Sequence, residues 1–303
     1  AQSARTRFEY EQYFPPKVLR ELERDPHLLE GRNQEVTLLV AGLQQFPRLA
    51  EQLGPQHTCR LVREVMQRLT ERVVEHGGVI VEYHGAGLIA LWNAPAAQAD
   101  HALLACGAAL AVLGEVPDLS GRWHATAGEA LRIGVALHTA EVQVGSVGSG
   151  HRFKYGAFGP GVSLASRVQQ ATARFGIPLL LTDSTRERLP ESLALRRLGR
   201  VDWPGVKEVV VLHQLYGISA SPLWSAFRDT YEQALELFES GAWAAAAERL
   251  LTLVNLSAPR HDLDTPALKL LQRVWECLEA RPETFDPVIE REERRGAPGG
   301  RRP

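Results

Sequence analysis

Cysteine is scarce in this chain of 303 residues, which holds only Cys59, Cys106 and Cys277. Three widely spaced cysteines without a CxxC pair exclude a disulfide framework and a cysteine-rich zinc site. Such sparse use of cysteine is typical of proteins of the reducing cytoplasm. Cys59 and Cys106 fall within helical patterns, so we expect both to be small core residues.

Neither sign of charge is in excess, because 34 Lys and Arg residues face 36 Asp and Glu residues. This balance gives no support for a nucleic-acid partner or an anionic membrane surface. No apolar run approaches the ~18 residues that a membrane span needs, and no signal peptide is evident. We therefore expect a cytoplasmic protein. The basic tail at 291–303 contains Gly, Pro and two short Arg pairs, which favours a disordered end over a binding arm.

Several catalytic signatures are also missing. The sequence has no GxxxxGK[ST] phosphate loop, no nucleophile elbow and no HExxH zinc motif. The glycine-rich run GSVGSG at 145–150 lies between strand-like segments, without a following helix at the right distance. We interpret this run as a turn.

Strand-like and helix-like patterns alternate along the first two thirds of the chain. Short runs rich in β-branched residues predict strands at 36–41, 79–83, 87–92, 131–147 (two strands with a break near 138–140), 178–182, 194–200 and 208–216. Apolar residues at steps of three and four predict helices at 56–76, 97–113 and 160–173, after an aromatic lead-in and a helix within 8–30. This order predicts an α/β or α+β sandwich with a mixed sheet.

The last third of the chain is helical by its period. One apolar stripe runs from Trp224 to Phe238, and Gly241 separates it from a second stripe that begins at Trp243. A third helix is predicted to begin at Thr265, which precedes a proline suited to the first turn. The pattern resembles a tetratricopeptide hairpin, and one such hairpin cannot bury its own apolar face. Two interpretations remain open, a packing subdomain and a dedicated protein-binding site.

Five blocks carry a wider resemblance. They are VTLLVAGLQQF (36–46), EHGGVIVEYHGAGLIALWNAP (75–95), DHALLACGAAL (100–110), LRIGVALHTAEVQVGSVGS (131–149) and YGAFGPGVSLASRVQ (155–169). In order and spacing, these blocks resemble the class III adenylate/guanylate cyclase homology domain. The aromatic-Pro-Pro lead-in and the segment DLDTPALKLLQR resemble the flanks of cyclase domains in some bacterial receptors.

The resemblance implies an α+β (α/β sandwich) fold of the ferredoxin-like class III cyclase type. Its sheet should be mixed and mostly antiparallel, with a C-terminal helical hairpin extension. The implied organisation is an N-terminal coupling segment and helix (1–33), a cyclase homology domain (34–217), a tetratricopeptide-like extension (218–290) and a disordered tail (291–303). Active sites of the family form at a head-to-tail dimer interface, which implies a homodimer or a heterodimer with another cyclase domain. The helical tail offers a place for a further protein partner. A chain beginning at Ala1 also fits the cytoplasmic part of a membrane receptor at the inner membrane.

The resemblance also identifies where metal ligands should stand. Cyclisation of a nucleotide uses two metal ions that clamp the attacking and leaving oxygens, and Mg²⁺ or Mn²⁺ requires oxygen ligands. The two family aspartates fall here on Gly42 and Ala86. Glu82 and His84 lie near them, but strand alternation directs both to the face opposite Tyr83 rather than clearly towards the metal position. We therefore expect no metal and no cofactor.

Most positions that bind nucleotide in the family are also changed. The base-recognising pair, a Lys with an Asp or Thr, falls on Glu82 and Gly156, and Phe46 is a further family nucleotide position. Glu82 reverses the charge and cannot donate as Lys would. The transition-state pair, Asn and Arg, falls on Ser163 and Arg167, which share a helix face. Arg167 is the only functional position retained, and it suits either a bidentate phosphate contact or an ordinary surface ion pair.

The scaffold motifs of the family therefore remain while its chemistry is lost. This pattern predicts a pseudo-cyclase, a dimerising signalling or regulatory module in cyclic-nucleotide signal transduction. Three alternatives stay open: an adenylate or guanylate cyclase with residual or heterodimer-dependent activity, a nucleotide or small-ligand binding module without chemistry, and a scaffold that acts through its helical tail.

Overall fold

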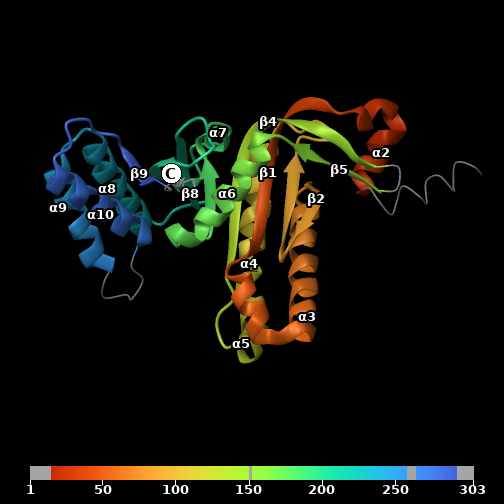
Figure 1. Ribbon diagram of the computed structural model, residues 1–303, viewed down its shortest axis with the longest axis horizontal. Coiled ribbons are helices and arrows are strands. Elements are labelled where there is room, and N and C mark those ends of the chain that lie inside the picture. Colours follow the sequence, from red (N-terminus) through yellow and green to blue (C-terminus); the bar gives the residue numbers. More distant parts are fainter. Residues whose placement is uncertain (1–14, 150–151, 258–263, 292–303) are drawn as a thin grey trace, which may run out of the picture. The chain divides into compact units, whose positions relative to one another are not determined.

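The computed structural model describes residues 15–149, 152–257 and 264–291. The chain forms two compact units, Ala1–Leu193 and Ala194–Pro303, whose helices and strands are labelled in Figure 1. The predicted disordered tail at 291–303 lies almost wholly outside the described residues, as does the aromatic lead-in before residue 15.

The described part of the first unit begins with two short helices, α2 (Pro16–Arg24) and the 3₁₀ helix η1 (Pro26–Glu30). The single predicted helix is interrupted at Asp25, whose carboxylate accepts a hydrogen bond from the backbone N–H of His27 at 3.0 Å. Proline at position 26 lacks the N–H that would continue α2. Val18 of α2 is fully buried, so α2 is part of the folded unit.

The sheet of the first unit has the strand order β2-β3-β1-β4-β6, with β5 paired to β4. Its strands are β1 (Arg32–Leu43), β2 (Val79–His84), β3 (Gly87–Trp92), β4 (Ile133–Ser149), β5 (Arg152–Phe158) and β6 (Leu179–Thr182). The pairing of β4 with β6 is parallel, and those of β1 with β3 and β4, of β2 with β3 and of β4 with β5 are antiparallel. This confirms the predicted mixed, mostly antiparallel sheet.

Strand β4 differs from the prediction, because it continues without the expected break near 138–140. His138 and Thr139 looked like a polar interruption, but both side chains are buried and hydrogen-bonded to neighbouring hydroxyl groups. The strand also continues through the glycine-rich run as far as Ser149. The turn expected at 145–150 is therefore wrong for its first five residues, which pair with β5.

Helix α3 (Phe46–Glu75) begins ten residues before its predicted start. It is kinked at Gly54, where φ is 68° and ψ is 169°, just before Pro55. Its predicted apolar face is confirmed by fully buried side chains, which are Leu61, Val65, Leu69 and Val73. Cys59 is exposed on this helix, so its expected place in the core is wrong, whereas Cys106 is buried.

The stretch His101–Ala127 is long and apolar enough, by length and composition alone, to cross a membrane. The sequence had not suggested this, because Glu115 and Asp118 interrupt its apolar run. In the structure it forms α4 (His101–Gly114) and α5 (Val116–Ala127), the latter not predicted. Helix α4 packs against α3 and against β1, β3 and β4, with buried residues Ala102, Ala105, Cys106, Ala108, Ala109 and Val112. This packing is that of a core helix.

A chain of buried hydroxyl groups crosses the interior of the first unit. Thr37 bonds His101 Nδ1 at 2.7 Å and the hydroxyl of Thr139 at 2.8 Å, and Thr139 bonds Thr185 at 3.0 Å. These residues come from β1, α4, β4 and the short helix α7 (Asp183–Arg186). Because each of these buried polar side chains has a hydrogen-bond partner, the network joins four elements without the free-energy cost of burying an unsatisfied polar group.

The described part of the second unit combines three strands with three helices. They are β7 (Ala194–Asp202), β8 (Val210–Gly217), α8 (Pro222–Glu239), α9 (Trp243–Ser257), α10 (Thr265–Ala280) and β9 (Val288–Arg291). Helix α8 packs on α9, and α9 packs on α10, which confirms the predicted helical extension. Strand β9 was not predicted, and it pairs in parallel with β7.

One ion pair fixes the helices of the second unit to its strands. The fully buried guanidinium of Arg196 on β7 makes two hydrogen bonds to Asp264, at 2.9 and 3.0 Å. The same guanidinium lies 4.8 Å from the ring centre of Tyr231. Asp264 also caps α10 by accepting from Ala267 N at 3.0 Å. Removal of either partner would leave a buried charge uncompensated, which is strongly destabilising.

The buried His138 makes stability depend on pH. Burial lowers the pKa of His138 from 6.5 to about 4, so the unfolded chain gains a proton near pH 6.5 that the folded chain does not. The neutral, buried His138 therefore contributes to the free energy of unfolding fully above pH 6.5, and this contribution is lost as the pH falls towards 4. Burial lowers the pKa of His101 in the same direction.

We expect the free energy of unfolding to fall by about 2 kcal/mol between pH 7.5 and pH 5, since one pKa unit corresponds to about 1.4 kcal/mol. Urea unfolding at a series of pH values measures this slope. In a His138→Gln variant, which keeps a donor for Thr182, the slope should be clearly smaller. Equal slopes in the two proteins would contradict the assignment to His138.

Candidate functional site

The pairing of β1 with β3 brings the two predicted metal positions together. Gly42 is opposite Gly87 in the register of the two strands, and Leu43 N donates to Ala86 O at 3.1 Å. The turn between β2 and β3 allows this approach, because Gly85 adopts a φ of 56°, where a residue with a side chain is strained. Positions 42 and 86 are therefore neighbours across two strands.

The side chains at this place do not fit a pair of divalent ions. Gly42 offers only backbone atoms, and Ala86 offers a buried methyl group with 5% of its surface exposed. His84 is exposed and Glu82 is engaged by Lys154. Within the described residues, no group of three or more His, Cys, Asp or Glu side chains is placed to hold a metal ion. Hard divalent ions need oxygen ligands, and none is supplied by the side chains of the two family positions.

The two predicted base-recognition positions also meet. Glu82 lies on β2 and Gly156 on β5. Lys154 donates to the carboxylate of Glu82, and a Cβ atom at position 156 would lie 3.6 Å from Lys154 Cε. The lysine therefore lies next to both positions. Its side chain and that of Glu82 are 44% and 37% exposed, so the pair contributes little to stability.

Lys154 is a residue that the sequence interpretation missed. Its signal was present, because residues two apart on a strand lie on the same face and Lys154 precedes Gly156 by two. A positive charge therefore stands beside the base position after all, but it comes from β5 and neutralises Glu82. The local charge pattern is the reverse of the family pattern, with the carboxylate on β2 and the ammonium on β5.

The remaining predicted positions lie on two helices. Ser163 and Arg167 are on α6 (Pro160–Phe175), which packs on β1 and β4. Ser163 is exposed and Arg167, one turn later, is partly buried. Phe46 is the first residue of α3 and is partly buried. The α6 pair thus shares one helix face as predicted, while Phe46 follows the end of β1 that carries Gly42.

The described elements match those of a known domain family. The family model named adenylate and guanylate cyclase catalytic domain matches residues 29–217. This match covers more than half of the chain. The chain belongs to the adenylate and guanylate cyclase family.

Members of this family with known names or structures support the assignment. Adenylate cyclase 1 of Rhizobium meliloti (strain 1021) is 28% identical over 214 residues, which cover 70% of this chain and 32% of that protein. The crystal structure of the guanylyl cyclase Cya2 is 26% identical, with a TM-score of 0.57, over 63% of this chain and 96% of the other. The adenylyl cyclase CyaB from P. aeruginosa shares the fold at 21% identity and a TM-score of 0.58, over 64% and 98% of the two chains.

This chain spans about a third of the length of the Rhizobium adenylate cyclase, since the match covers 32% of it. The similar proteins include both adenylyl and guanylyl cyclases. Family membership therefore establishes the class III cyclase fold and a cyclase domain, and it leaves the nucleotide and the activity of this chain to be tested.

The close approach of β1 and β3 can be tested by one methyl group. A Cβ atom at Gly87 would lie 2.2 Å from Ala41 O and 2.8 Å from Gly42 Cα. We expect Gly87→Ala to lower the free energy of unfolding by about 1–3 kcal/mol, the usual cost of overpacking. The measurement is urea unfolding followed by circular dichroism.

Gly121→Ala is the matched control, because a Cβ atom at position 121 of α5 would meet nothing within 4 Å. This change should leave stability unchanged or raise it by up to about 1 kcal/mol, since alanine suits a helix better than glycine. If both variants behaved alike, the two strands would not be in the close contact described.

Proposed function

We propose that this member of the cyclase family is a pseudo-cyclase, a dimerising signalling or regulatory module in cyclic-nucleotide signal transduction. The observation that carries the proposal is the meeting of Gly42 and Ala86 at the place of the two metal-binding aspartates, without a side-chain oxygen between them. A cyclase that lacks both ligands cannot hold the ions that clamp the attacking and leaving oxygens.

Losses elsewhere in the site support the proposal. The base position on β2 carries Glu82, which is bound to Lys154, and Ser163 stands at the position of the transition-state asparagine. Arg167 alone remains of the six family positions that bind metal, recognise the base or stabilise the transition state. Because binding, orientation and metal chemistry are all altered, replacing one metal ligand would leave the other deficiencies in place.

The preserved scaffold supports a role for the fold itself. The family model matches the chain from residue 29 to 217, so the surfaces that dimerise in the family are retained in outline. We place the protein in the cytoplasm, where it would act as a homodimer or as the partner of an intact cyclase domain. The tetratricopeptide-like helices α8–α10 would serve a protein partner or the packing of the second unit.

The activity test uses the whole chain with Mn-ATP and with Mn-GTP. We expect no cyclic nucleotide by mass spectrometry, either from the natural sequence or from Ala86→Asp. The double change of Gly42→Asp with Ala86→Asp should also remain inactive. A Cβ atom at position 42 would lie 3.3 Å from Gly87 Cα, so a side chain there requires a small shift of β3.

The control is Arg167→Ala, since turnover that survives this change comes from a contaminating cyclase. Turnover that is abolished by Arg167→Ala would contradict the proposal and favour a residual cyclase. Saturable nucleotide binding in calorimetry without any product would instead favour the alternative of a nucleotide-binding module, in which Arg167 on α6 would contact a phosphate group.

Dimerisation is the second expectation. Sedimentation equilibrium of the whole chain should show a dimer, alone or with an added cyclase domain of the same family. A strict monomer at high concentration under both conditions would contradict a module that works through the cyclase dimer interface.

A further inference from the structure

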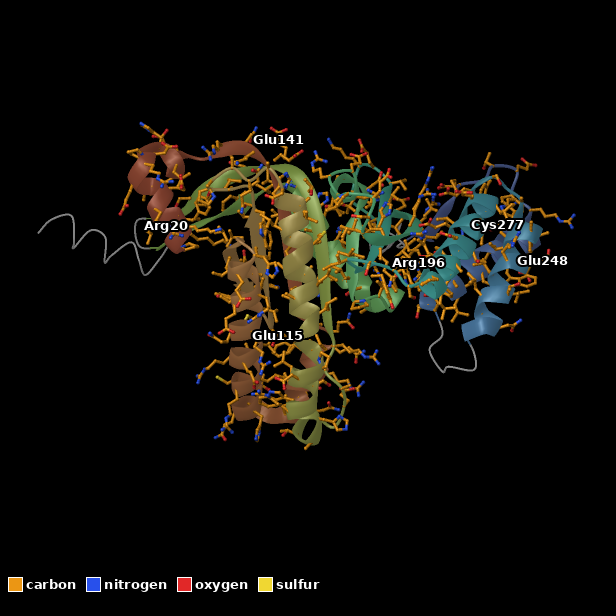
Figure 2. The ribbon with its side chains drawn as sticks, turned by 180° about the vertical axis from the view of Figure 1, so that it is seen from behind. Arg20, Glu115, Glu141, Arg196, Glu248 and Cys277 are labelled. Carbon is orange, nitrogen blue, oxygen red and sulfur yellow. The ribbon has the colours of Figure 1, made fainter. Side chains whose placement is uncertain are left out.

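A cavity of 340 Å³ lies between helix α2 and the loop that follows β3. Its volume is within the lower range of small-molecule sites. None of the family nucleotide or metal positions lines it. The lining residues are Lys17, Arg20, Glu21 and Arg24 from α2, with Ala94, Pro95, Ala96 and Gln98 from the loop. Figure 2 shows the side chain of Arg20 on this helix.

The charges of this cavity are unbalanced. Three of its four charged residues are cations, and the one acid, Glu21, is paired with Arg24 at 2.8 Å. Among the residues that the structure describes, Lys17 and Arg20 have no acidic partner. The described part of the cavity therefore presents two positive charges, on residues three apart in α2, that no described carboxylate neutralises.

Lys17 shows the effect of this imbalance. Its side chain is partly buried, and its ammonium group donates to Gly77 O at 2.5 Å. Burial and the nearby charge of Arg20 lower the pKa of Lys17. An ammonium group has three donors, so two N–H groups of Lys17 stay available for a ligand.

The loop side of the cavity is held rigidly. Asn93 and Gln98 exchange two bonds between backbone N–H groups and side-chain oxygens, at 2.8 and 2.7 Å. Gln98 Nε2 also donates to Gly77 O at 3.2 Å, the oxygen that Lys17 bonds. Arg32 donates to Pro95 O at 2.7 Å. The apolar wall is therefore fixed before any ligand binds, which reduces the entropy lost on binding.

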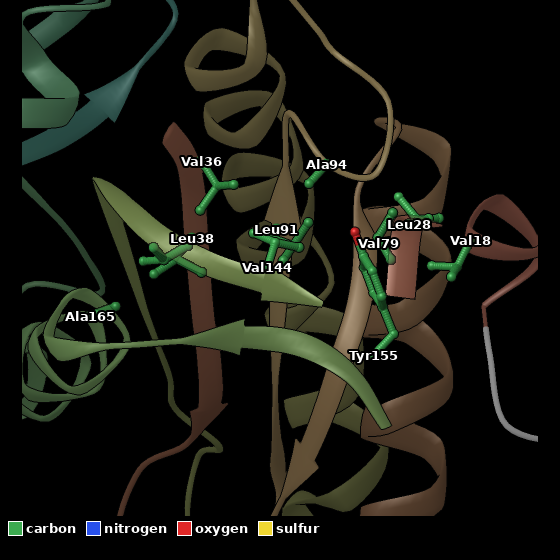
Figure 3. Packing of buried hydrophobic residues seen from close by; sticks show 11 residues of the cluster. Val18, Leu28, Val36, Leu38, Val79, Leu91, Ala94, Val144, Tyr155 and Ala165 are labelled. Atoms are coloured by element: carbon green, nitrogen blue, oxygen red, sulfur yellow. The ribbon is translucent and has the colours of Figure 1, made fainter. Parts of the chain in front are cut away.

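The helix side is held by packing. Val18 of α2 and Leu28 of η1 are buried in one cluster with Leu91, Ala94 and Tyr155 from the sheet and its loop (Figure 3). Val18 packs into this cluster and so holds α2 in place, with Lys17 and Arg20 of the same helix lining the cavity. Both walls are thus formed from segments far apart in the sequence, as expected for a preformed site rather than a chance hollow in one loop.

We propose that this cavity binds a small organic anion, whose carboxylate or phosphate group is held by Lys17 and Arg20. Its apolar part would lie against Ala94 and Pro95. Arginine and lysine bind such groups by charge-assisted hydrogen bonds. The ligand would join α2 to the loop after β3, and so would fix the lead-in helix on the first unit.

Isothermal titration of the whole chain at low ionic strength tests this site, with phenyl phosphate and benzoate as probes. Phenol is the neutral control, and inorganic phosphate is the control without an apolar part. We expect saturable binding of one equivalent of phenyl phosphate or benzoate, tighter than that of inorganic phosphate, and no binding of phenol. Arg20→Gln and Lys17→Gln should each weaken binding at least tenfold.

The matched control variant is Arg60→Gln, since Arg60 is an exposed arginine of α3 without a described ion-pair partner. Its affinity for the probes should equal that of the unchanged chain. Binding of only one probe would support the site and decide between phosphate and carboxylate. No saturable binding of either probe, or equal binding by Arg20→Gln, would overturn the proposal, as would an equal loss in Arg60→Gln.

Discussion

The pairing of β1 with β3 on one side and with β4 on the other is the constraint on which the first unit depends. Gly42 is the point where the three strands meet, opposite Gly87 on β3 and Gly134 on β4. A one-residue slip in either register would reverse the face of every side chain on β1. The same pairing determines which residues lie at the family's metal positions, so the fold and the candidate site depend on one register.

The residues at positions 42 and 86 can vary because the pairing of the strands does not depend on their side chains. Strands are held by backbone hydrogen bonds and by buried side chains such as Leu38 and Leu91, and neither needs a carboxylate at position 42 or 86. Glycine at position 42 and alanine at position 86 fit the close approach of β1 to β3. The pairing of these strands therefore does not require carboxylate side chains at positions 42 and 86.

Much of the first unit could be predicted because its signals are local. The hairpin of β2 and β3 and the apolar face of α3 follow from short-range periodicity. The continuity of β4 could not be predicted, since His138 and Thr139 become compatible with a buried strand only through partners such as Thr182. Helix α5 was missed because its sequence mixes Gly, Ser, Pro and polar residues, and it is stabilised by contacts with α3 and α4.

The candidate site likewise combines features that the sequence predicts with features that depend on residues distant in the chain. The residues at the family positions could be identified from the sequence alone, whereas the meeting of positions 42 and 86 is given by the register of β1 with β3. The ion pair of Lys154 with Glu82 was missed, because it joins strands of two different hairpins. The basic cavity at Lys17 was missed as well, since half of its wall comes from a loop about 80 residues away along the chain.

Strand β9 has a consequence for the order in which the second unit assembles. It pairs with β7 at Arg200 and Val288, on opposite sides of the three helices α8–α10 in the chain. Contacts between residues so distant in sequence form slowly, because the entropy of closing a long loop is lost before the contacts stabilise the structure. We expect the helices to fold first and to shorten the distance that β9 must cover, so that the last strand in the sequence is also the last to join the sheet.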